Sequence, residues 1–532
     1  MVQAFVAETV RTCLEKGEMT HMSVTTFAAI YVGSYEVSLK VFEISGKKNI
    51  RTIDFIRSRV ELGKDAFHGQ PIGYELVDEL CDVLHEFRRM MDGYRVDAYE
   101  AYAGPVLRNI SNCLFLLDQI ERRTGIRLKI VGNSEHRFLS YKCVASKPEF
   151  DRMISESAAV VNVGGGELQI TLFVHGEVLT TQHLVLGTMR LAQLFSDGNV
   201  RAENIRQQMT ELIDKEMEVF KAQYYQNRTI KYLILTGDYS LEMIRRMDKN
   251  LDNTTVDAGK FSSYLKRLEK KESAQIAEAL NLSNDSDILL SPSLILYRRI
   301  VETLAADAIW VPGIDISDGI VYDYALRHRY VKPVHDFDKD ILSAAHALSQ
   351  RYMSYSPHID ALVEMSSLIY DAMKKVHGMG KRERLLLQTA AILHDCGKYV
   401  SFANAPQCAY DIILSSEIMG LSHRDRVIVA SIVKYNTYPL DAYDEVSDVL
   451  DQEGYLIVAK CASILRVANA MDRSHKQKYK NVRAVLKGKQ LIISIETADG
   501  MLLEKTMFGA KAGMFEDVFS IKPVIKEKKI YQ

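Results

Sequence analysis

The pair His394-Asp395 is the first feature of this chain that could carry out chemistry. It ends the apolar stretch AAILHDCGK at residues 390–398. Burying a histidine and a carboxylate at a helix end is unfavourable unless the pair binds something. Because imidazole nitrogens and carboxylate oxygens are common ligands of divalent metals, the pair is a candidate metal site.

A glycine turn between two apolar segments is the second such feature, and it occurs twice. Gly33-Ser34 follows FAAIYV (27–32), and Gly164-Gly165-Gly166 follows AAVVNV (158–163). Glycine permits positive φ and lets a phosphate approach backbone N–H groups closely. A plain hairpin turn is the better explanation of a single occurrence, but three consecutive glycines weaken a sheet without any gain in packing. The matched turns therefore predict a clamp for a phosphate chain.

The elements around these turns predict two related α/β domains. Each turn joins two predicted strands, and strand and helix patterns follow both hairpins, so the structure is expected to be duplicated. Further predicted elements are a helix over 107–124 and a strand over 126–131.

The strand signals stop after Lys332-Pro333, and residues 336–471 have helical spacing throughout. A strand pattern returns at 484–497, and we expect short strands from there to the end. The predicted organisation is an extension (1–23), two α/β domains (24–150 and 151–331), a helical domain (332–480) and a small C-terminal domain (481–532).

Composition argues against several classes of protein. The net charge is −2, so no global field attracts nucleic acid or an anionic membrane. No apolar run reaches the roughly 18 residues of a membrane span. The seven cysteines lack CxxC spacing, which is typical of reduced thiols. We expect a cytoplasmic protein that binds neither nucleic acid nor membranes.

The order of the motifs resembles the Ppx/GppA family of exopolyphosphatases and guanosine pentaphosphate phosphohydrolases. FAAIYVGSYE and NVGGGELQI are similar to its two phosphate loops, VGNSEHR (131–137) to its SGxEEAR-like segment, and ISDGIVYDYA (316–325) to a later SDG segment. Arg108 and Asn112 match a TxxxRxxxN helix start. The resemblance runs from about residue 24 to the end. It implies an α/β, actin-like ATPase (ribonuclease H-like) fold in duplicate, then an all-α HD-type domain and a small α+β domain.

The resemblance implies Mg²⁺-dependent hydrolysis of terminal phosphoanhydride bonds in inorganic polyphosphate or pppGpp, by a homodimer. It makes Glu135 the general base that activates water. Arg108 would bind phosphate through its planar guanidinium. The loop residues that would bind phosphate are Gly33, Ser34, Gly164, Gly165 and Gly166.

Three acidic positions of that family are replaced in this chain. The first-loop aspartate is Tyr31, the second-loop aspartate is Asn162, and the STE triplet is Glu167-Leu168-Gln169. Losing carboxylates weakens a Mg²⁺ site, and Glu36 and Glu167 are the acids that could compensate. A non-catalytic regulator that binds polyphosphate or (p)ppGpp is therefore an alternative.

The helical domain resembles the HD phosphohydrolase superfamily, which holds a divalent metal with a histidine, the HD doublet and a distant aspartate. The matching residues are His358, His394, Asp395 and Asp472. Accessory histidines are absent from NAPQCAY (404–410) and KYNT (434–437), which argues against a two-metal site. The alternatives are an HD-type metal phosphohydrolase and a helical domain whose His-Asp pair only holds helix ends together.

Overall fold

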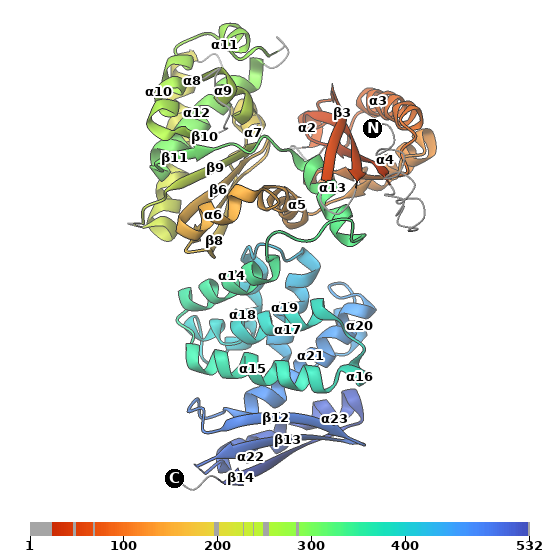
Figure 1. Cartoon of the computed structure of the whole chain (residues 1–532), viewed down its shortest axis with the longest axis vertical. Helices are drawn as coiled ribbons and strands as arrows, with labels where there is room; N and C mark the ends of the chain where they lie inside the picture. The colour runs from red at the N-terminus through yellow and green to blue at the C-terminus, as the bar shows by residue number, and fades with distance from the viewer. Residues whose placement is uncertain are drawn as a thin grey trace, which may run out of the picture. The chain divides into compact units, whose positions relative to one another are not determined.

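The computed structural model describes residues 24–45, 49–66, 70–195, 202–226, 228–237, 239–247, 255–282, 287–498 and 500–529 (Figure 1). The predicted extension at 1–23 lies outside these residues. The chain divides into two compact units. Unit 1 contains the described residues up to Pro148 together with Ile314–Val334, and unit 2 contains Glu149–Gly313 and the chain from His335 onward.

Unit 1 is built on a five-stranded sheet with strand order β3-β2-β1-β4-β5. The predicted hairpin is confirmed, with β1 antiparallel to β2 and β4 parallel to β1. The strand expected over 126–131 is reduced to the two residues of β5. The strands are β1 (Thr25–Val32), β2 (Glu36–Ser45), β3 (Asn49–Arg59), β4 (Ala98–Ala103) and β5 (Lys129–Ile130). The helices are α2 (Gly63–Ala66), α3 (Tyr74–Gly93), η1 (Pro105–Asn109), α4 (Cys113–Thr124), α5 (Asn133–Ala145) and α13 (Ile316–Arg327).

The helix predicted over 107–124 is wrong in its first part. A 3₁₀ turn, η1, comes first, Ile110 is extended with ψ 141°, and the α-helix begins only at Cys113. The Asn112 side chain bonds both the N–H and the carbonyl of Ile72, at 3.1 Å each. Leu107 and Ile110 are buried in this non-helical backbone, so their apolar character could not reveal the break.

Helices α5 and α13 cover one face of the unit 1 sheet. Phe27 of β1 stacks on Tyr324 of α13 with ring centroids 4.2 Å apart. A Cβ atom on Gly319 would lie 2.3 Å from the carbonyl oxygen of Leu139, so only glycine lets α13 approach α5 this closely. This packing fixes α5, which carries Glu135.

Unit 2 begins with a six-stranded sheet of order β10-β11-β9-β6-β7-β8. As in unit 1, an antiparallel meander is followed by a strand parallel to its first member, here β9 beside β6. The duplication expected from the glycine turns is therefore confirmed. The strands are β6 (Ser157–Val163), β7 (Leu168–Val174), β8 (Glu177–Leu184), β9 (Tyr232–Gly237), β10 (Thr255–Asp257) and β11 (Ala308–Trp310). The helices are α6 (Pro148–Glu156), α7 (Thr188–Leu194), α8 (Ala202–Phe220), the π-helical turn η2 (Lys221–Tyr225), α9 (Ser240–Met247), α10 (Ala258–Leu268), α11 (Ser273–Leu280) and α12 (Asp287–Leu304).

The next part of unit 2 is helical, as expected. Its elements are α14 (Phe337–Arg351), α15 (Ser356–Ala372), α16 (Lys374–His377), α17 (Lys381–Leu393), η4 (Cys396–Tyr399), α18 (Ala405–Ser415), α19 (His423–Tyr435), α20 (Tyr443–Val446) and α21 (Gln452–Met471). Within the described residues, α21 alone is long and apolar enough to cross a membrane by length and composition. The prediction that no apolar run is long enough to span a membrane overlooked α21, because Lys460 and Arg466 interrupt the apolar residues of this helix. Of its most apolar window, 72% is buried inside the protein, so α21 forms the core of this part.

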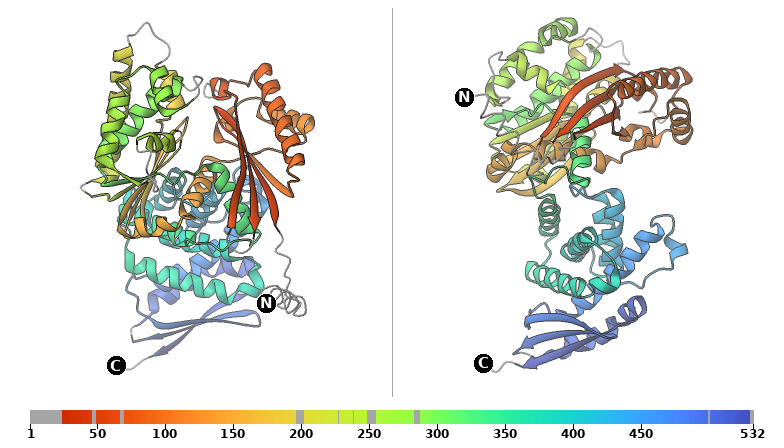
Figure 2. Two further views of the ribbon diagram at one scale, coloured as in Figure 1. Left: turned by 45° about the horizontal axis from the view of Figure 1, so that its top comes forward. Right: turned by 45° about the vertical axis from the view of Figure 1, so that its right-hand side comes forward.

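The C-terminal part is a three-stranded sheet, drawn blue in Figure 2, that lies against one end of these helices. It contains β12 (Lys480–Lys487), β13 (Gln490–Thr497) and β14 (Lys522–Lys529), with α22 (Leu502–Lys511) and α23 (Gly513–Phe519) between the last two strands. The small α+β domain implied by the family resemblance is confirmed, although the residue pattern alone had indicated only short strands after residue 497. Because β14 runs parallel to β13, a crossover longer than a hairpin must join them, and the two helices supply it.

Candidate functional site

The two glycine turns close in the same way. The N–H of Gly33 donates to the carbonyl of Glu36 at 2.9 Å, and the N–H of Gly164 donates to that of Glu167 at 3.0 Å. The N–H of the first glycine is thus used inside each turn. A phosphate at either turn would depend on the N–H groups that follow, those of Ser34, Gly165 and Gly166.

The second turn also caps α7. The N–H of Thr188 donates to the carbonyl of Gly164 at 3.1 Å, and the N–H groups of Met189 and Arg190 donate to that of Gly165 at 3.0 Å. A Cβ atom on Gly187 would lie 2.1 Å from the same Gly165 oxygen. Gly187 is therefore required for the position of the loop, although its place in the sequence gives no signal of this role.

Residues with neutral side chains stand two places before each turn, where the family resemblance expects aspartates. The hydroxyl of Tyr31 is hydrogen-bonded to Nε2 of His136 at 2.8 Å. A Cβ atom on Gly104 would lie 2.6 Å from that hydroxyl, so Gly104 leaves the space that Tyr31 fills. In unit 2, Oδ1 of Asn162 accepts a hydrogen bond from Oγ1 of Thr236 at 3.2 Å.

These neutral groups do not fit a resident Mg²⁺ ion at the glycine turns. Mg²⁺ prefers carboxylate oxygens, and neither Tyr31 nor Asn162 offers one. Within either unit taken separately, the described residues also place no cluster of three acidic, histidine or cysteine ligands at a glycine turn. The residues at the glycine turns therefore do not form a resident Mg²⁺ site.

Glu135 and Arg108 both lie near Gly132, at the N-terminus of α5. Oε2 of Glu135 accepts the N–H of Gly132 at 2.9 Å, which caps the helix. A Cβ atom on Gly132 would lie 3.3 Å from Nη1 of Arg108 and 3.5 Å from Oε2 of Glu135. Both side chains are exposed. A guanidinium and a carboxylate thus flank a helix N-terminus, where N–H groups and the helix dipole favour an anion.

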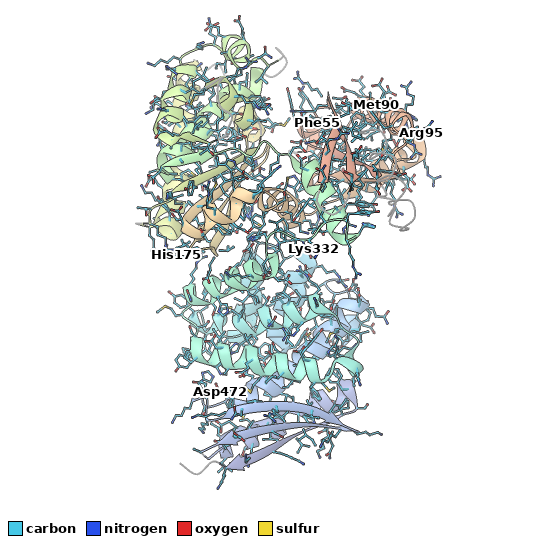
Figure 3. The ribbon with its side chains drawn as sticks, viewed as in Figure 1. Phe55, Met90, Arg95, His175, Lys332 and Asp472 are labelled. Atoms are coloured by element: carbon cyan, nitrogen blue, oxygen red, sulfur yellow. The ribbon has the colours of Figure 1, made fainter. Side chains whose placement is uncertain are left out.

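The predicted metal ligands are brought together in the helical part of unit 2. His358 lies in the first turn of α15, His394 and Asp395 follow α17, and Asp472 follows α21 and is labelled in Figure 3. The side chains of His358 and Asp472 are each 1% exposed. Nδ1 of His358 lies 2.8 Å from Oδ2 of Asp472, and the His358 and His394 rings are 5.0 Å apart. The four residues are therefore neighbours.

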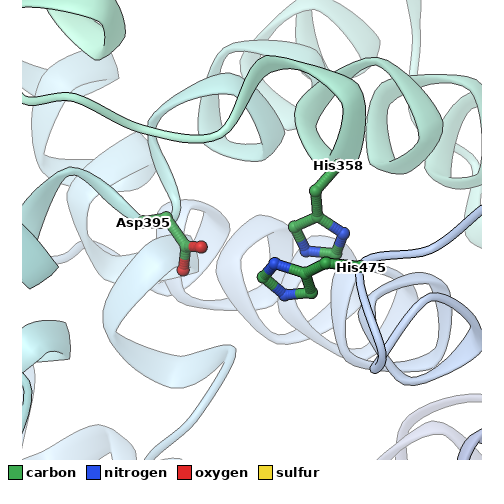
Figure 4. A group of neighbouring side chains, drawn as sticks. All are labelled: His358, Asp395 and His475. Atoms are coloured by element: carbon green, nitrogen blue, oxygen red, sulfur yellow. The ribbon is translucent and has the colours of Figure 1, made fainter.

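The structure adds His475 to this set. Potential ligand atoms of His358, Asp395 and His475 all lie within 4.8 Å of one another. Figure 4 shows the two imidazoles side by side with the Asp395 carboxylate directed toward them. The His475 ring stacks on that of His358 with centroids 3.7 Å apart. Its only sequence signal is its place three residues after Asp472.

Asp472 is already engaged by other groups. Besides His358, it accepts hydrogen bonds from the N–H of Gln477 at 2.9 Å and from its side-chain amide at 2.8 Å. Burial alone would raise the pKa of Asp472, but these hydrogen bonds hold it below its usual range. Asp472 is thus an ionised carboxylate that orients His358.

The protonation states around His394 suit a metal. Burial lowers the pKa of His394 to about 4, so its imidazole is neutral at pH 7. Burial would raise the pKa of Asp395, but the charge and hydrogen bond of Lys398 help to hold it below its usual range. Burial and the neighbouring His358 lower the pKa of His475. Neutral imidazoles and an ionised carboxylate are the forms that bind divalent metals.

The paired sheets, each with a meander, a glycine turn and a parallel strand, define an actin-like ATPase fold. Two family models match the chain, "Ppx/GppA phosphatase family" at residues 41–328 and "Ppx/GppA phosphatase, domain III" at 343–510. The chain belongs to the Ppx/GppA phosphatase family.

Individual relatives are distant. The chain is 21% identical to a guanosine-5'-triphosphate,3'-diphosphate pyrophosphatase of Aeromonas hydrophila over 453 residues, which are 83% of this chain and 86% of that protein. The crystal structure of an exopolyphosphatase from Cytophaga hutchinsonii aligns with a TM-score of 0.50 and 18% identity, covering 58% of this chain and 99% of that one. The structural similarity supports the fold alone.

Proposed function

We propose that this protein hydrolyses the terminal phosphoanhydride bond of a linear phosphate chain. The observation that carries the proposal is the convergence of Arg108 and Glu135 at the N-terminus of α5, in a chain of the Ppx/GppA phosphatase family. The same helix end supplies backbone N–H groups, so an anion and a reacting water would meet both side chains.

Each residue has a distinct role in the proposed reaction. In unit 1 the Arg108 guanidinium and the N–H group of Ser34 bind phosphate oxygens. In unit 2, considered by itself, the N–H groups of Gly165 and Gly166 are proposed to bind phosphate as well. The Glu135 carboxylate takes a proton from the attacking water. The water oxygen then forms a bond to the terminal phosphorus while the bridging P–O bond breaks, which releases inorganic phosphate and a chain shortened by one phosphate.

The substrate we propose is inorganic polyphosphate or pppGpp. Both present a terminal phosphoanhydride on a flexible, highly charged chain, and the two solved or curated relatives are named for these two substrate types. From the family resemblance we further propose that the protein is a homodimer in the cytoplasm. The mass of the protein in solution would test the dimer.

The experiment is a phosphate-release assay on both substrates, with and without Mg²⁺. We expect release from at least one substrate, and a loss of at least about 100-fold in Glu135→Gln, the scale of general-base catalysis. Glu75→Gln is the matched control, because Glu75 is also an exposed glutamate in the first turn of a unit 1 helix. Absence of release from both substrates at every Mg²⁺ concentration would overturn the proposal.

A second candidate function is binding of the same ligands without turnover. It is favoured by Tyr31 and Asn162, whose side chains bond to neighbours where the resemblance expects metal-binding acids. Tight binding of polyphosphate or (p)ppGpp, measured by calorimetry on a protein that releases no phosphate, would establish this function instead.

A third candidate is an HD-type hydrolase in the helical part, favoured by the cluster of His358, His394 and Asp395. For this candidate to hold, the protein must bind a metal, and the His394→Ala variant must lose phosphate release. If purified protein contains no Mn, Fe, Ni or Zn and this variant keeps full activity, the third candidate is excluded.

A further inference from the structure

The C-terminal sheet buries one face and exposes the other. Figure 1 shows its strands β12, β13 and β14 side by side. Leu491, Ile493 and Ile495 of the central strand β13 are at most 1% exposed, so they form the buried face. Successive side chains of a strand point to opposite faces, and Gln490 and Ser494 between them are exposed. The strand partners of residues 490, 492, 494 and 496 therefore define the exposed face.

The strand register gathers positive charge on this exposed face. In three of its four cross-strand rows, a basic residue lies on each side of the β13 residue. These rows are Lys487-Gln490-Lys522, Arg483-Ser494-Lys526 and Lys480-Glu496-Lys528. All of these basic residues are exposed, and the acid of the rows, Glu496, is paired with Lys528 at 2.8 Å. We refer to the four rows together as the basic sheet face.

The basic sheet face can attract a polyanion although the whole chain has a net charge of −2. Charges are screened over about 8 Å at physiological salt, so a ligand at this face responds to the local side chains. The expectation that the protein binds no nucleic acid was based on the net charge, which does not describe this face. The basic residues that form no ion pair within the described part of the chain are Lys480, Arg483, Lys487, Lys522 and Lys526.

The fourth row is apolar and lies between two basic rows. It consists of Val485, Ile492 and Val524, and Val485 is 48% exposed. The basic rows on its two sides are four residues apart along the strands, which corresponds to about 13 Å. Inorganic polyphosphate has no apolar part that could cover this row, whereas the bases of a nucleic acid do. Lysine side chains are longer than the valines between them, so the row does not reach the acyl region of a bilayer.

We propose that the basic sheet face binds single-stranded nucleic acid. The phosphates pair with the basic rows, and the bases, which a single strand leaves accessible, cover the apolar row of Val485, Ile492 and Val524. Among its described residues the face has no aromatic side chain on which a base could stack, so binding depends mainly on charge and has little sequence preference. This site is independent of the phosphate release proposed for Glu135.

The test is fluorescence anisotropy of the full chain with labelled oligouridylate and oligothymidylate of about 16 nucleotides. We expect a dissociation constant on the order of 10 µM at physiological salt, and weaker binding as the salt concentration rises. Binding of either probe supports the proposal, and the tighter of the two shows whether ribose or deoxyribose is preferred. Absence of binding to both probes at about 50 mM salt would overturn it.

A double variant tests the position of the site. Lys487→Gln combined with Lys522→Gln removes one basic row, and we expect about tenfold weaker binding of the oligonucleotides. The slope of log affinity against log salt concentration should fall by about 1.4, the value for two phosphate contacts of a single strand. Lys374→Gln combined with Lys375→Gln, at two exposed lysines of α16, is the matched control. At equal melting temperatures, equal affinities of the two double variants would refute the assigned face.

The apolar row distinguishes nucleic acid from inorganic polyphosphate. Val485→Thr keeps the β-branched shape that suits a strand and makes the row more polar. We expect this variant to bind oligouridylate about threefold more weakly, because burial of an exposed methyl group is lost. Its affinity for polyphosphate should be unchanged. Oligouridylate binding that Val485→Thr leaves unchanged, or polyphosphate binding that is tighter than oligouridylate binding and is lost in the Lys487→Gln, Lys522→Gln variant, would overturn the assignment to nucleic acid.

Discussion

The hydroxyl of Tyr31 lies 2.8 Å from Nε2 of His136, which ties the end of β1 to the first turn of α5. His136 directly follows Glu135, the proposed base. The side chain in the expected position of a metal-binding aspartate therefore supports the helix that carries the base, and a substitution here affects both.

Restoring the acid in Tyr31→Asp is expected to increase Mg²⁺-dependent phosphate release. A carboxylate at the end of β1 supplies an oxygen ligand for an ion that arrives with the substrate. We expect a gain of about tenfold in kcat, equivalent to about 1.4 kcal/mol. Tyr31→Phe keeps the ring and loses the hydroxyl, so it should show no gain. Equal rates in Tyr31→Asp and Tyr31→Phe would argue against the role expected for this position.

Gly187→Ala should displace the second glycine turn. The new Cβ atom would meet the Gly165 oxygen at 2.1 Å, and backbone cannot move aside as a flexible side chain can. We expect kcat/KM for phosphate release to fall by about 100-fold, the effect of misplacing a site by about 1 Å. Gly93→Ala is the control, because a Cβ atom there meets nothing within 4 Å. A Gly187→Ala enzyme with unchanged kcat/KM would show that this turn does not bind substrate.

His335 should make the stability of unit 2 depend on pH. Its Nδ1 lies 2.6 Å from Oδ1 of Asp151 and its Nε2 lies 2.7 Å from Oδ2 of Asp340, so both nitrogens face carboxylates. Burial lowers the pKa of His335, but the two carboxylates outweigh it and the pKa is raised. The charged imidazole therefore stabilises the fold fully below the unfolded pKa of about 6.5, and this stabilisation is lost as pH rises through the folded pKa.

The measurement is the difference in unfolding free energy between wild type and His335→Gln from pH 5 to 9. We expect the difference to be largest at the acidic end and to shrink as the pH rises. His85→Gln, at an exposed histidine, should show no such trend. A difference that grows with pH would contradict the assigned charge.

Lys40→Met should destabilise unit 1. The Lys40 ammonium is 2.9 Å from Asp315 and 2.7 Å from Asp318, and its side chain is 9% exposed. Removing it leaves two carboxylates together without a counterion, and we expect a loss of about 3 kcal/mol in the unfolding free energy, measured by urea denaturation. Arg51→Met removes an exposed surface pair of the same sheet and should cost less than about 1 kcal/mol. Equal effects of the two changes would show that burial of the Lys40 pair is unimportant.

Local sequence patterns predicted the helices and strands in which apolar residues recur at one regular spacing. They failed where contacts between residues far apart in the chain determine the backbone conformation. The β1–β2 and β6–β7 hairpins were predicted because apolar runs flank glycine turns. The start of α4 was missed because Asn112 bonds to Ile72, a residue far away in the chain. The helices before β14 were missed because only the parallel pairing with β13 requires a crossover.

For the candidate sites, the sequence by itself determined which residue types are present: Glu135 and Arg108 in one half, and His358, His394 and Asp395 in the other. Their chemistry follows from residue type and from position relative to predicted helix ends. Only the tertiary structure decided that Asp472 faces Nδ1 of His358 and that the His475 ring stacks on the His358 ring. Hydrogen-bond partners and ring orientation depend on how α15, α17 and α21 pack together, and no local spacing along the chain specifies that packing.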